Sequence, residues 1–194
     1  MSEERIHDCL PNTFYPRWTE TLRDGSHVLI RPIHPEDAHA EREFIEGLSP
    51  EARRFRFLGS MSHPSERVIA QLTDIDYTHE MAFVATVRDD DSESIVGVSR
   101  YSADPQGRNC ECAVTVSDEW QNRGLGTALM KHLIEMARGN GIKRMYSIDA
   151  ADNVRMRELA HYLGFHTRTD PDDGSQVLHE IDLQASVNRG MQAS

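Results

Sequence analysis

Apolar residues recur at spacings of three and four along residues 125–138, a pattern that predicts a strongly amphipathic helix. The apolar positions are Leu125, Leu129, Met130, Leu133, Ile134 and Ala137. The glycine-containing run 139–141 follows them and is a typical helix stop. Upstream, residues 110–116 are rich in β-branched side chains, as expected of a buried or half-buried strand. The segment 121–127 therefore connects a strand to a helix.

The rest of the chain continues in an α/β order. We expect a strand near 27–32, helical segments across 35–47, 50–57 and 64–72, strands at 81–87 and 94–99 forming a hairpin, a strand at 145–148, a helix at 153–163 and a final hairpin around 171–174. We assign residues 1–21 to a polar N-terminal arm, 22–184 to one domain, and 185–194 to a flexible tail.

Composition narrows the class of protein. The 194 residues suffice for one full core, with 38% hydrophobic and 27% charged residues. The sequence shows no span-length apolar run and no signal-peptide pattern, so we expect a cytoplasmic protein that does not contact a membrane. Three cysteines favour reduced core thiols, and no histidine spacing indicates a metal.

The net charge of −11 argues against a nucleic-acid partner, because phosphate backbones are bound mainly by excess Lys and Arg. An acidic surface would attract amines, polyamines or Lys-bearing protein segments. The same charge is also explained by solubility alone.

The segment 121–127 is a candidate phosphate cradle. The first amides of a helix lack partners and carry partial positive charge, so a phosphate there gains hydrogen bonds and dipole energy together. Gly124 and Gly126 would let the ligand approach closely. The P-loop and dinucleotide fingerprints do not fit, because no Lys-Ser/Thr pair follows and Leu129 stands where a third glycine is needed. A plain loop that enters a helix is the alternative interpretation.

The pattern Gln-x-x-Gly-x-Gly between this strand and this helix resembles the acetyl-CoA signature of the GNAT superfamily of N-acetyltransferases. Residues 29–37, 95–99 and 153–165 are similar to its first strand, third strand and late helix, so the resemblance covers roughly residues 22–183. It implies a single GNAT domain with a central mixed, mostly antiparallel twisted sheet flanked by helices. It also implies that acetyl-CoA, as cosubstrate, lies in the splay after the central strand.

The resemblance implies the site residues as well. The implied cofactor-binding residues are Val114, Val116, Gln121, Asn122, Arg123, Gly124, Leu125, Gly126, Thr127 and Asn153. Arg123 and Lys131 are candidate partners of the cofactor phosphates, though each could equally be a solvated surface residue. Asn153 also suits the N-cap of the late helix, and both roles are compatible.

Glu111 is the candidate catalytic residue. Acetyl transfer needs a neutral amine, and a Lys amine with a pKa of about 10.4 is mostly protonated near neutral pH. In the family a Glu on this strand is the general base, and we expect Glu111 to share a strand face with Ala113 and Thr115. The alternative is a surface carboxylate without a catalytic role.

The chain departs from the family pattern at the general acid. Many members carry a Tyr seven residues after the Asn, and this chain has Ala160 there. Tyr162 lies about 200° further round the helix and is expected to face elsewhere. The proton for coenzyme A could come from solvent, or from Tyr146 or Ser147.

The sequence says least about the amine that accepts the acetyl group. Residues 48–58 and 72–85 look like the acetyltransferase domain of bacterial protein lysine acetyltransferases, which modify acyl-CoA synthetases. A small-amine acetyltransferase and a non-catalytic acyl-CoA-binding module are the alternatives. We expect a monomer or homodimer.

Independently of the acceptor, Phe55 and Phe57 are predicted to pack on the sheet, with Arg53, Arg54 and Arg56 directed to water.

Overall fold

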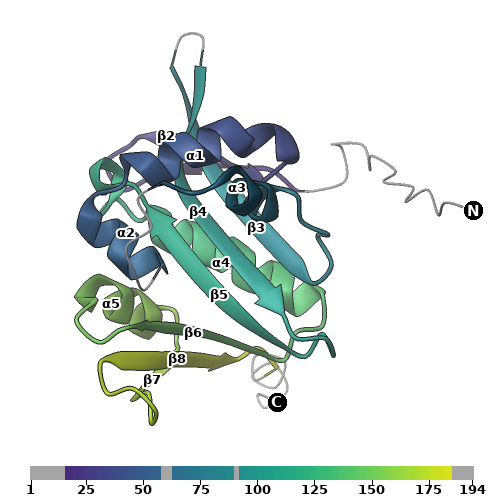
Figure 1. The fold of residues 1–194 in the computed structure, drawn as a ribbon, viewed down its shortest axis with the longest axis vertical. Coiled ribbons are helices and arrows are strands. Elements are labelled where there is room, and N and C mark those ends of the chain that lie inside the picture. The colour runs from purple at the N-terminus through teal and green to yellow at the C-terminus, as the bar shows by residue number, and fades with distance from the viewer. Residues whose placement is uncertain (1–15, 58–62, 90–91, 185–194) are drawn as a thin grey trace, which may run out of the picture.

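The computed structural model describes residues 16–57, 63–89 and 92–184, which form one mixed sheet with helices on both faces (Figure 1). In chain order the elements are β1 (Trp18–Thr21), β2 (His27–Pro32), the 3-10 helix η1 (Pro35–Asp37), α1 (Ala38–Gly47), α2 (Pro50–Phe57), α3 (Glu66–Thr73), β3 (Glu80–Asp89), β4 (Ser92–Ala103), β5 (Asn109–Val116), the 3-10 helix η2 (Asp118–Trp120), α4 (Leu125–Gly139), β6 (Arg144–Ala150), α5 (Val154–Tyr162), β7 (His166–Thr169) and β8 (Gln176–Asp182).

The strands lie in the order β1-β2-β3-β4-β5-β6-β8-β7. Every neighbouring pair is antiparallel except β5 and β6, which run parallel. The parallel pair requires a crossover connection, and α4 supplies it. The expected mixed, mostly antiparallel sheet is therefore confirmed.

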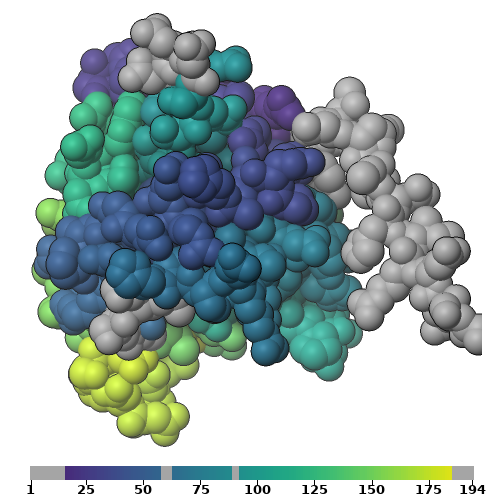
Figure 2. Space-filling model, turned by 45° about the horizontal axis from the view of Figure 1, so that its top comes forward, coloured from purple at the N-terminus to yellow at the C-terminus, as the bar shows by residue number. Residues whose placement is uncertain are grey.

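Two apolar cores lie on opposite faces of the sheet. On one face α4 packs against β3, β4 and β5 through residues such as Leu129 and Leu133, and Ala160 of α5 belongs to the same core. On the other face α1 and α3 pack through residues such as Phe44 and Ile69. Figures 1 and 2 show α1, α2 and α3 as a layer over that face. Because both faces of β3 are covered, its residues 81–86 are all buried.

Helix α4 buries the six apolar residues that the spacing identified, which confirms the predicted helix. At its C-terminal end the C-cap residue Asn140 donates through Nδ2 to the hydroxyl of Tyr101 on β4, at 2.7 Å. This contact fixes the end of the helix on the sheet.

The segment that resembles the first strand of the family is held by an ion-pair cluster. The Arg31 guanidinium donates to both carboxylate oxygens of Asp37, each at 2.8 Å, and to Glu93 at 2.9 Å. The pair with Asp37 is bidentate and its side chains are largely buried, which favours a defined geometry. It ties β2 to the start of α1 and to β4.

The sheet begins earlier than expected, because Trp18–Thr21 is strand β1 rather than part of an arm. Trp18 pairs with Ile30 of β2, and its ring stacks on His132 of α4 at 3.8 Å between centroids. His132 Nε2 also lies 2.7 Å from Glu20. The rest of the expected arm, residues 1–15, and the tail 185–194 lie outside the described residues. Cys110 and Cys112 are buried and free.

We predict that Gly97→Ala destabilises the fold, because a Cβ there would lie 2.9 Å from Leu129 Cδ1 and 3.2 Å from Leu125 Cδ2. Crowding at the β4–α4 contact should lower the free energy of unfolding by about 1–3 kcal/mol, measured by urea denaturation. Gly47→Ala is the control, since nothing lies within 4 Å of its Cβ position. Equal stability of the two variants would contradict the close packing of α4 on β4.

Candidate active site

Strand β5 is paired with β6 over only its first three residues. The pairs are Asn109 with Arg144, Cys110 with Met145 and Glu111 with Tyr146. On its other edge β5 stays paired with β4 as far as Val116. The backbone groups of residues 112–116 that face β6 therefore have no strand partner, and the two strands diverge after Glu111.

This divergence opens into a cavity of about 920 Å³. Its walls are β5, the segment 118–127, the end of β6, the start of α5 and, on the outer side, α2. All but one of the predicted site residues line it: Glu111, Val114, Val116, Gln121, Asn122, Gly124, Leu125, Gly126, Thr127 and Asn153. The exception is Arg123. Residues separated by more than 40 positions in the sequence thus share one cavity.

The N-terminus of α4 faces this cavity with free donors. Gly124 is its N-cap in the left-handed conformation, φ +92°, and no side chain caps the helix. The first-turn amides therefore stay available. A Cβ on Gly126 would meet Leu159 Cδ2 at 3.5 Å and Val116 Cγ2 at 3.7 Å, which are ordinary contacts. Packing does not require glycine at 126, and its missing side chain leaves the helix end open to the cavity.

Gln121 and Asn153 brace the cavity from two sides. Gln121 Nε2 donates to the carbonyl of Val116 at 3.2 Å, and its Oε1 accepts from Arg155. Asn153 is the N-cap of α5 and its Oδ1 accepts from the amide of Met156 at 3.2 Å. The capping role of Asn153 is confirmed, and its place in the cavity wall is compatible with a second role in binding.

The guanidinium groups that line the cavity do not include the predicted Arg123. Arg123 donates to Asp24 at 2.8 Å and lies over the Trp120 ring, outside the cavity lining. Instead Arg23, from the β1–β2 connection, and Arg155, from α5, line the cavity. Arg23 Nε lies 3.4 Å from the Cβ position of Gly124. Sequence reasoning missed Arg23 because about 100 positions separate it from the segment that it accompanies.

Glu111 lies where β5 leaves β6. Its side chain is exposed. As expected, it shares one face of β5 with Ala113 and Thr115, and α2 covers this face further along the strand. It also lines a second cavity of about 510 Å³, with Ser102, Tyr146 and Arg144 among the lining residues. Glu111 is thus accessible from the large cavity on one side and from the smaller one on the other.

Helix α2 forms the outer wall, and two polar contacts hold it there. Arg54 pairs with Asp152 in the turn before α5 at 2.7 Å. At the helix start, the Ser49 hydroxyl donates to Asp118 at 2.8 Å. Phe55 and Phe57 are half-buried and line the cavity. Phe57 also packs against the core on the α1 and α3 face of the sheet, as predicted.

Arg56 lies in the cavity wall and does not point to water, so the expectation for this residue was wrong. Burial and the nearby charge of Arg100 lower the pKa of its guanidinium to about 10, against the opposing attraction of the carboxylates Glu41, Glu111 and Asp149. The periodicity of a short helix with three arginines does not show which one faces inward; only the packing of α2 over β5 and β6 does.

The cavity also contains a carboxyl group that the sequence did not single out. Asp149 lines its wall from β6, and its side chain is only 14% exposed. Burial raises the pKa of this carboxyl above its usual range, against the opposing effects of a Ser147 hydrogen bond and of His179.

The hydroxyl groups that could protonate the sulfur of coenzyme A do not lie at the position of the family Tyr. Ala160 is buried in the core. Tyr162 borders the cavity after all, at an exposed position where Lys131 lies 5.8 Å from its ring. Tyr146 lines the second cavity instead, and Ser147 is buried and donates to Asp149 at 2.7 Å.

Within the described ranges, no cluster of His, Cys, Asp or Glu could hold a metal ion. No helix found there has the length and apolar character needed to span a membrane.

Comparison with known families agrees with this geometry. The profile described as "Acetyltransferase (GNAT) family" matches residues 45–165, which is more than half of the chain. The chain belongs to the GNAT acetyltransferase family. This GNAT protein is therefore an N-acetyltransferase, a member of the acyltransferases, and the family uses acetyl-CoA.

Two curated proteins and one crystal structure resemble this GNAT domain. "Acetyltransferase PA5475" of Pseudomonas aeruginosa is 51% identical over 166 residues, which cover 86% of this chain and 89% of that protein. "Acetyltransferase Pat" of Mycolicibacterium smegmatis is 29% identical over 146 residues, covering 74% of this chain but only 42% of Pat. The crystal structure of the GNAT domain of S. lividans PAT aligns with a TM-score of 0.79 at 25% identity, covering 86% of this chain and 96% of that domain.

The residues of this GNAT domain fit acetyl-CoA. The unpartnered edge of β5 offers amides and carbonyls to an extended arm, as a neighbouring strand would. The uncapped start of α4, with Arg23 and Arg155 in the same cavity, suits a pyrophosphate. Both features open on one cavity, so a single long ligand can use them together.

We predict that Gly126→Glu weakens acetyl-CoA binding by about 100-fold or more, equivalent to about 2.7 kcal/mol. The added carboxylate would fill the open helix start and repel a phosphate there. Isothermal titration calorimetry measures the effect. Gly126→Ala is the matched control and should fold normally, because its Cβ meets only ordinary contacts. Unchanged affinity in Gly126→Glu would refute the cradle.

Proposed function

We propose that this GNAT enzyme transfers the acetyl group of acetyl-CoA to the side-chain amine of a protein lysine, with Glu111 as general base. The observation that carries the proposal is the position of Glu111. It lies where β5 and β6 separate, in the wall of the cavity that contains the α4 N-terminus, and it also opens on the second cavity.

This position suits the chemistry of an ammonium acceptor. Most of a lysine amine is protonated near neutral pH, and a carboxylate within reach, directly or through one water, accepts the proton before attack. An acceptor that enters through the second cavity would meet Glu111 from one side, with the thioester on the other. Direct attack on the thioester then needs no acyl-enzyme intermediate.

The charge of the cavity wall also favours a cationic acceptor. Six carboxyl groups line it: Glu51, Glu111, Asp118, Asp149, Asp152 and Glu158. Three guanidiniums, Arg23, Arg56 and Arg155, line it as well. Because carboxylates outnumber cations, the potential attracts an ammonium group even with the phosphate-binding arginines in place.

Two further observations support a protein as the acceptor. The segments 48–58 and 72–85 resemble those of bacterial protein lysine acetyltransferases, and the chain is similar in sequence to Pat and in structure to the S. lividans PAT domain. The acceptor we propose is a lysine of a folded protein such as an acyl-CoA synthetase, in the cytoplasm. The remainder of Pat, more than half of its length, has no counterpart in this match, so we do not transfer its regulation.

The acceptor is tested by measuring coenzyme A release from acetyl-CoA with a panel of amines. The panel contains an acyl-CoA synthetase, lysine-bearing peptides, polyamines and an aminoglycoside. Release driven by protein or peptide lysine supports the proposal. Rapid turnover of small amines alone would identify a small-amine acetyltransferase. Tight acetyl-CoA binding without release from any acceptor would contradict catalysis and favour an acyl-CoA-binding module.

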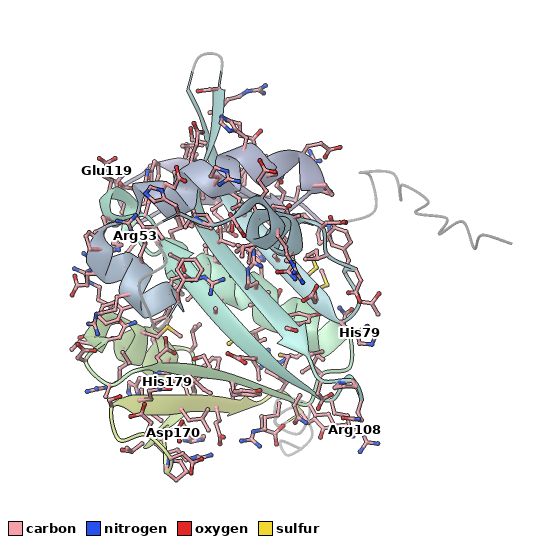
Figure 3. The ribbon with its side chains drawn as sticks, in the orientation of Figure 1. Arg53, His79, Arg108, Glu119, Asp170 and His179 are labelled. Atoms are coloured by element: carbon pink, nitrogen blue, oxygen red, sulfur yellow. The ribbon has the colours of Figure 1, made fainter. Side chains whose placement is uncertain are left out.

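We predict that Glu111→Gln lowers kcat by about 100-fold or more while acetyl-CoA affinity stays within about 2-fold, because the amide keeps the shape but accepts no proton. Glu119→Gln is the control, since this residue of the neighbouring η2, labelled in Figure 3, is not among the residues that line the cavity. The loss in Glu111→Gln should shrink as pH rises, because more of the amine is then neutral. A wild-type rate in this variant would remove Glu111 from the mechanism.

A further inference from the structure

The cavity has groups suited to the pyrophosphate of coenzyme A, at the start of α4, and to its acyl end, near Glu111. The cofactor continues beyond the pyrophosphate into a ribose, which carries a phosphate on its 3′ oxygen, and an adenine. A cation would bind this second phosphate, and a flat apolar surface would bind the adenine.

Helix α5 presents exposed apolar side chains on the wall of the cavity. Among the described residues, the large hydrophobic side chains that remain exposed are Val154, at 56%, and Tyr162, at 62%. Both belong to α5, and both line the cavity. An aromatic ring left in water beside a ligand cavity gives a flat ligand group a surface on which to stack.

Lys131 of α4 lies beside the Tyr162 ring. Its Nζ is 5.8 Å from the ring centroid, within the range of a cation–π contact. The lysine side chain is exposed, and among the described residues its ammonium group forms no ion pair. The two residues thus place an aromatic ring and an available positive charge side by side, one from each helix.

Contacts between α4 and α5 place this pair next to the pyrophosphate position. Near the start of α4, a Cβ on Gly126 would lie 3.5 Å from Leu159 Cδ2 of α5. On α5, Tyr162 follows Leu159 by three residues. On α4, Lys131 follows Gly126 by five residues, which is roughly 7.5 Å along the helix. A ribose that leaves a pyrophosphate at Gly126 therefore brings its 3′-phosphate and adenine within reach of Lys131 and Tyr162.

The same geometry argues against the Tyr162 hydroxyl as the proton donor to the sulfur. The sulfur belongs at the Glu111 end of the gap between β5 and β6. Tyr162 is the last residue of α5, roughly 12 Å along the helix from Val154 and beyond the point where Leu159 meets the start of α4. The pantetheine arm therefore separates this hydroxyl from the sulfur. A thiol with a pKa of about 8.5 leaves as a thiolate that solvent can protonate.

We propose that Tyr162 and Lys131 bind the 3′-phosphoadenosine end of the acyl-CoA, the tyrosine by stacking on adenine and the lysine by pairing with the 3′-phosphate. This requires acetyl-CoA to bind in the cavity, and so rests on the proposed function. The pair makes the enzyme specific for the free coenzyme, because a phosphopantetheine attached to a carrier protein has neither adenosine nor 3′-phosphate. Glu158, one helical turn before Tyr162 in the cavity wall, repels the phosphate and confines it to the Lys131 side.

Lys131→Gln tests the phosphate contact through binding alone. Isothermal titration calorimetry measures the affinities for coenzyme A and for 3′-dephospho-coenzyme A, which differ only in that phosphate. We expect wild type to prefer coenzyme A by about 10-fold and Lys131→Gln to bind the two equally. Lys143→Gln is the matched control, because the chain contains just these two lysines and Lys143 is exposed outside the cavity lining. A Lys131→Gln variant that keeps the preference would show that Lys131 does not bind the 3′-phosphate.

Tyr162 is tested first by removing its ring and then by keeping it. Tyr162→Ala should weaken the binding of coenzyme A and of its 3′-dephospho form alike, by about 10-fold, and leave the affinity for 4′-phosphopantetheine unchanged. Tyr162→Phe should restore the lost affinity, because its ring stacks as well. Equal affinities in Tyr162→Ala and wild type would refute the stacking. A fall in kcat of about 100-fold in Tyr162→Phe would make the hydroxyl the acid and overturn the assigned role.

Binding and turnover separate the nucleotide site from the proposed function. A wild-type protein that binds no coenzyme A would refute the cavity as the cofactor site, and the nucleotide site with it. Equal wild-type affinities for coenzyme A and its 3′-dephospho form would refute the nucleotide site alone. The predicted preference in binding, without coenzyme A release from any acceptor, would support the nucleotide site and refute acetyl transfer.

Discussion

The incomplete pairing of β5 with β6 is the constraint on which the rest of the site depends. A strand inside a sheet normally satisfies its backbone groups on both edges, and β5 does so on the β4 edge for almost its whole length. On the β6 edge pairing stops at Glu111. The groups beyond that point need a partner, and an extended acyl-CoA arm can supply one. The end of the pairing also puts Glu111 at the mouth of the gap, and Asp149 on the opposite strand inside it.

The cavity has to bind an anionic pyrophosphate and a cationic amine acceptor. A pyrophosphate needs donors and positive charge, which the uncapped α4 start, Arg23 and Arg155 provide. An ammonium acceptor needs carboxylates, and the wall contains more of these than guanidiniums. Arg56 lies near Glu111 and Asp149 and balances part of their charge in the absence of an acceptor. Because its guanidinium is already partly desolvated, an incoming ammonium group would compete with it for these two carboxylates.

Much of the fold and the cofactor side of the site could be predicted from the sequence, because these features are local. The spacing of Leu125 to Ala137 predicts α4, and the glycines at 124 and 126, at its N-terminus, predict an open helix start. Strand β1 was missed because Trp18–Thr21 is short and partly polar, and only pairing with β2 shows that it belongs to the sheet. Arg56 and Asp149 were missed because their places in the cavity wall depend on α2 and β6 meeting β5 in space. No periodicity in the sequence contains that information.

The central claim is that an acyl-CoA occupies the gap between β5 and β6, and a crystal structure of the protein with coenzyme A tests it most directly. The account predicts that the pantetheine amides bond to the free edge of β5 beyond Glu111, and that the pyrophosphate lies on the first amides of α4 near Gly124 and Gly126. The sulfur should then lie near Glu111, where β5 and β6 diverge. Coenzyme A bound elsewhere, or a β5 edge left without ligand contacts, would contradict the account.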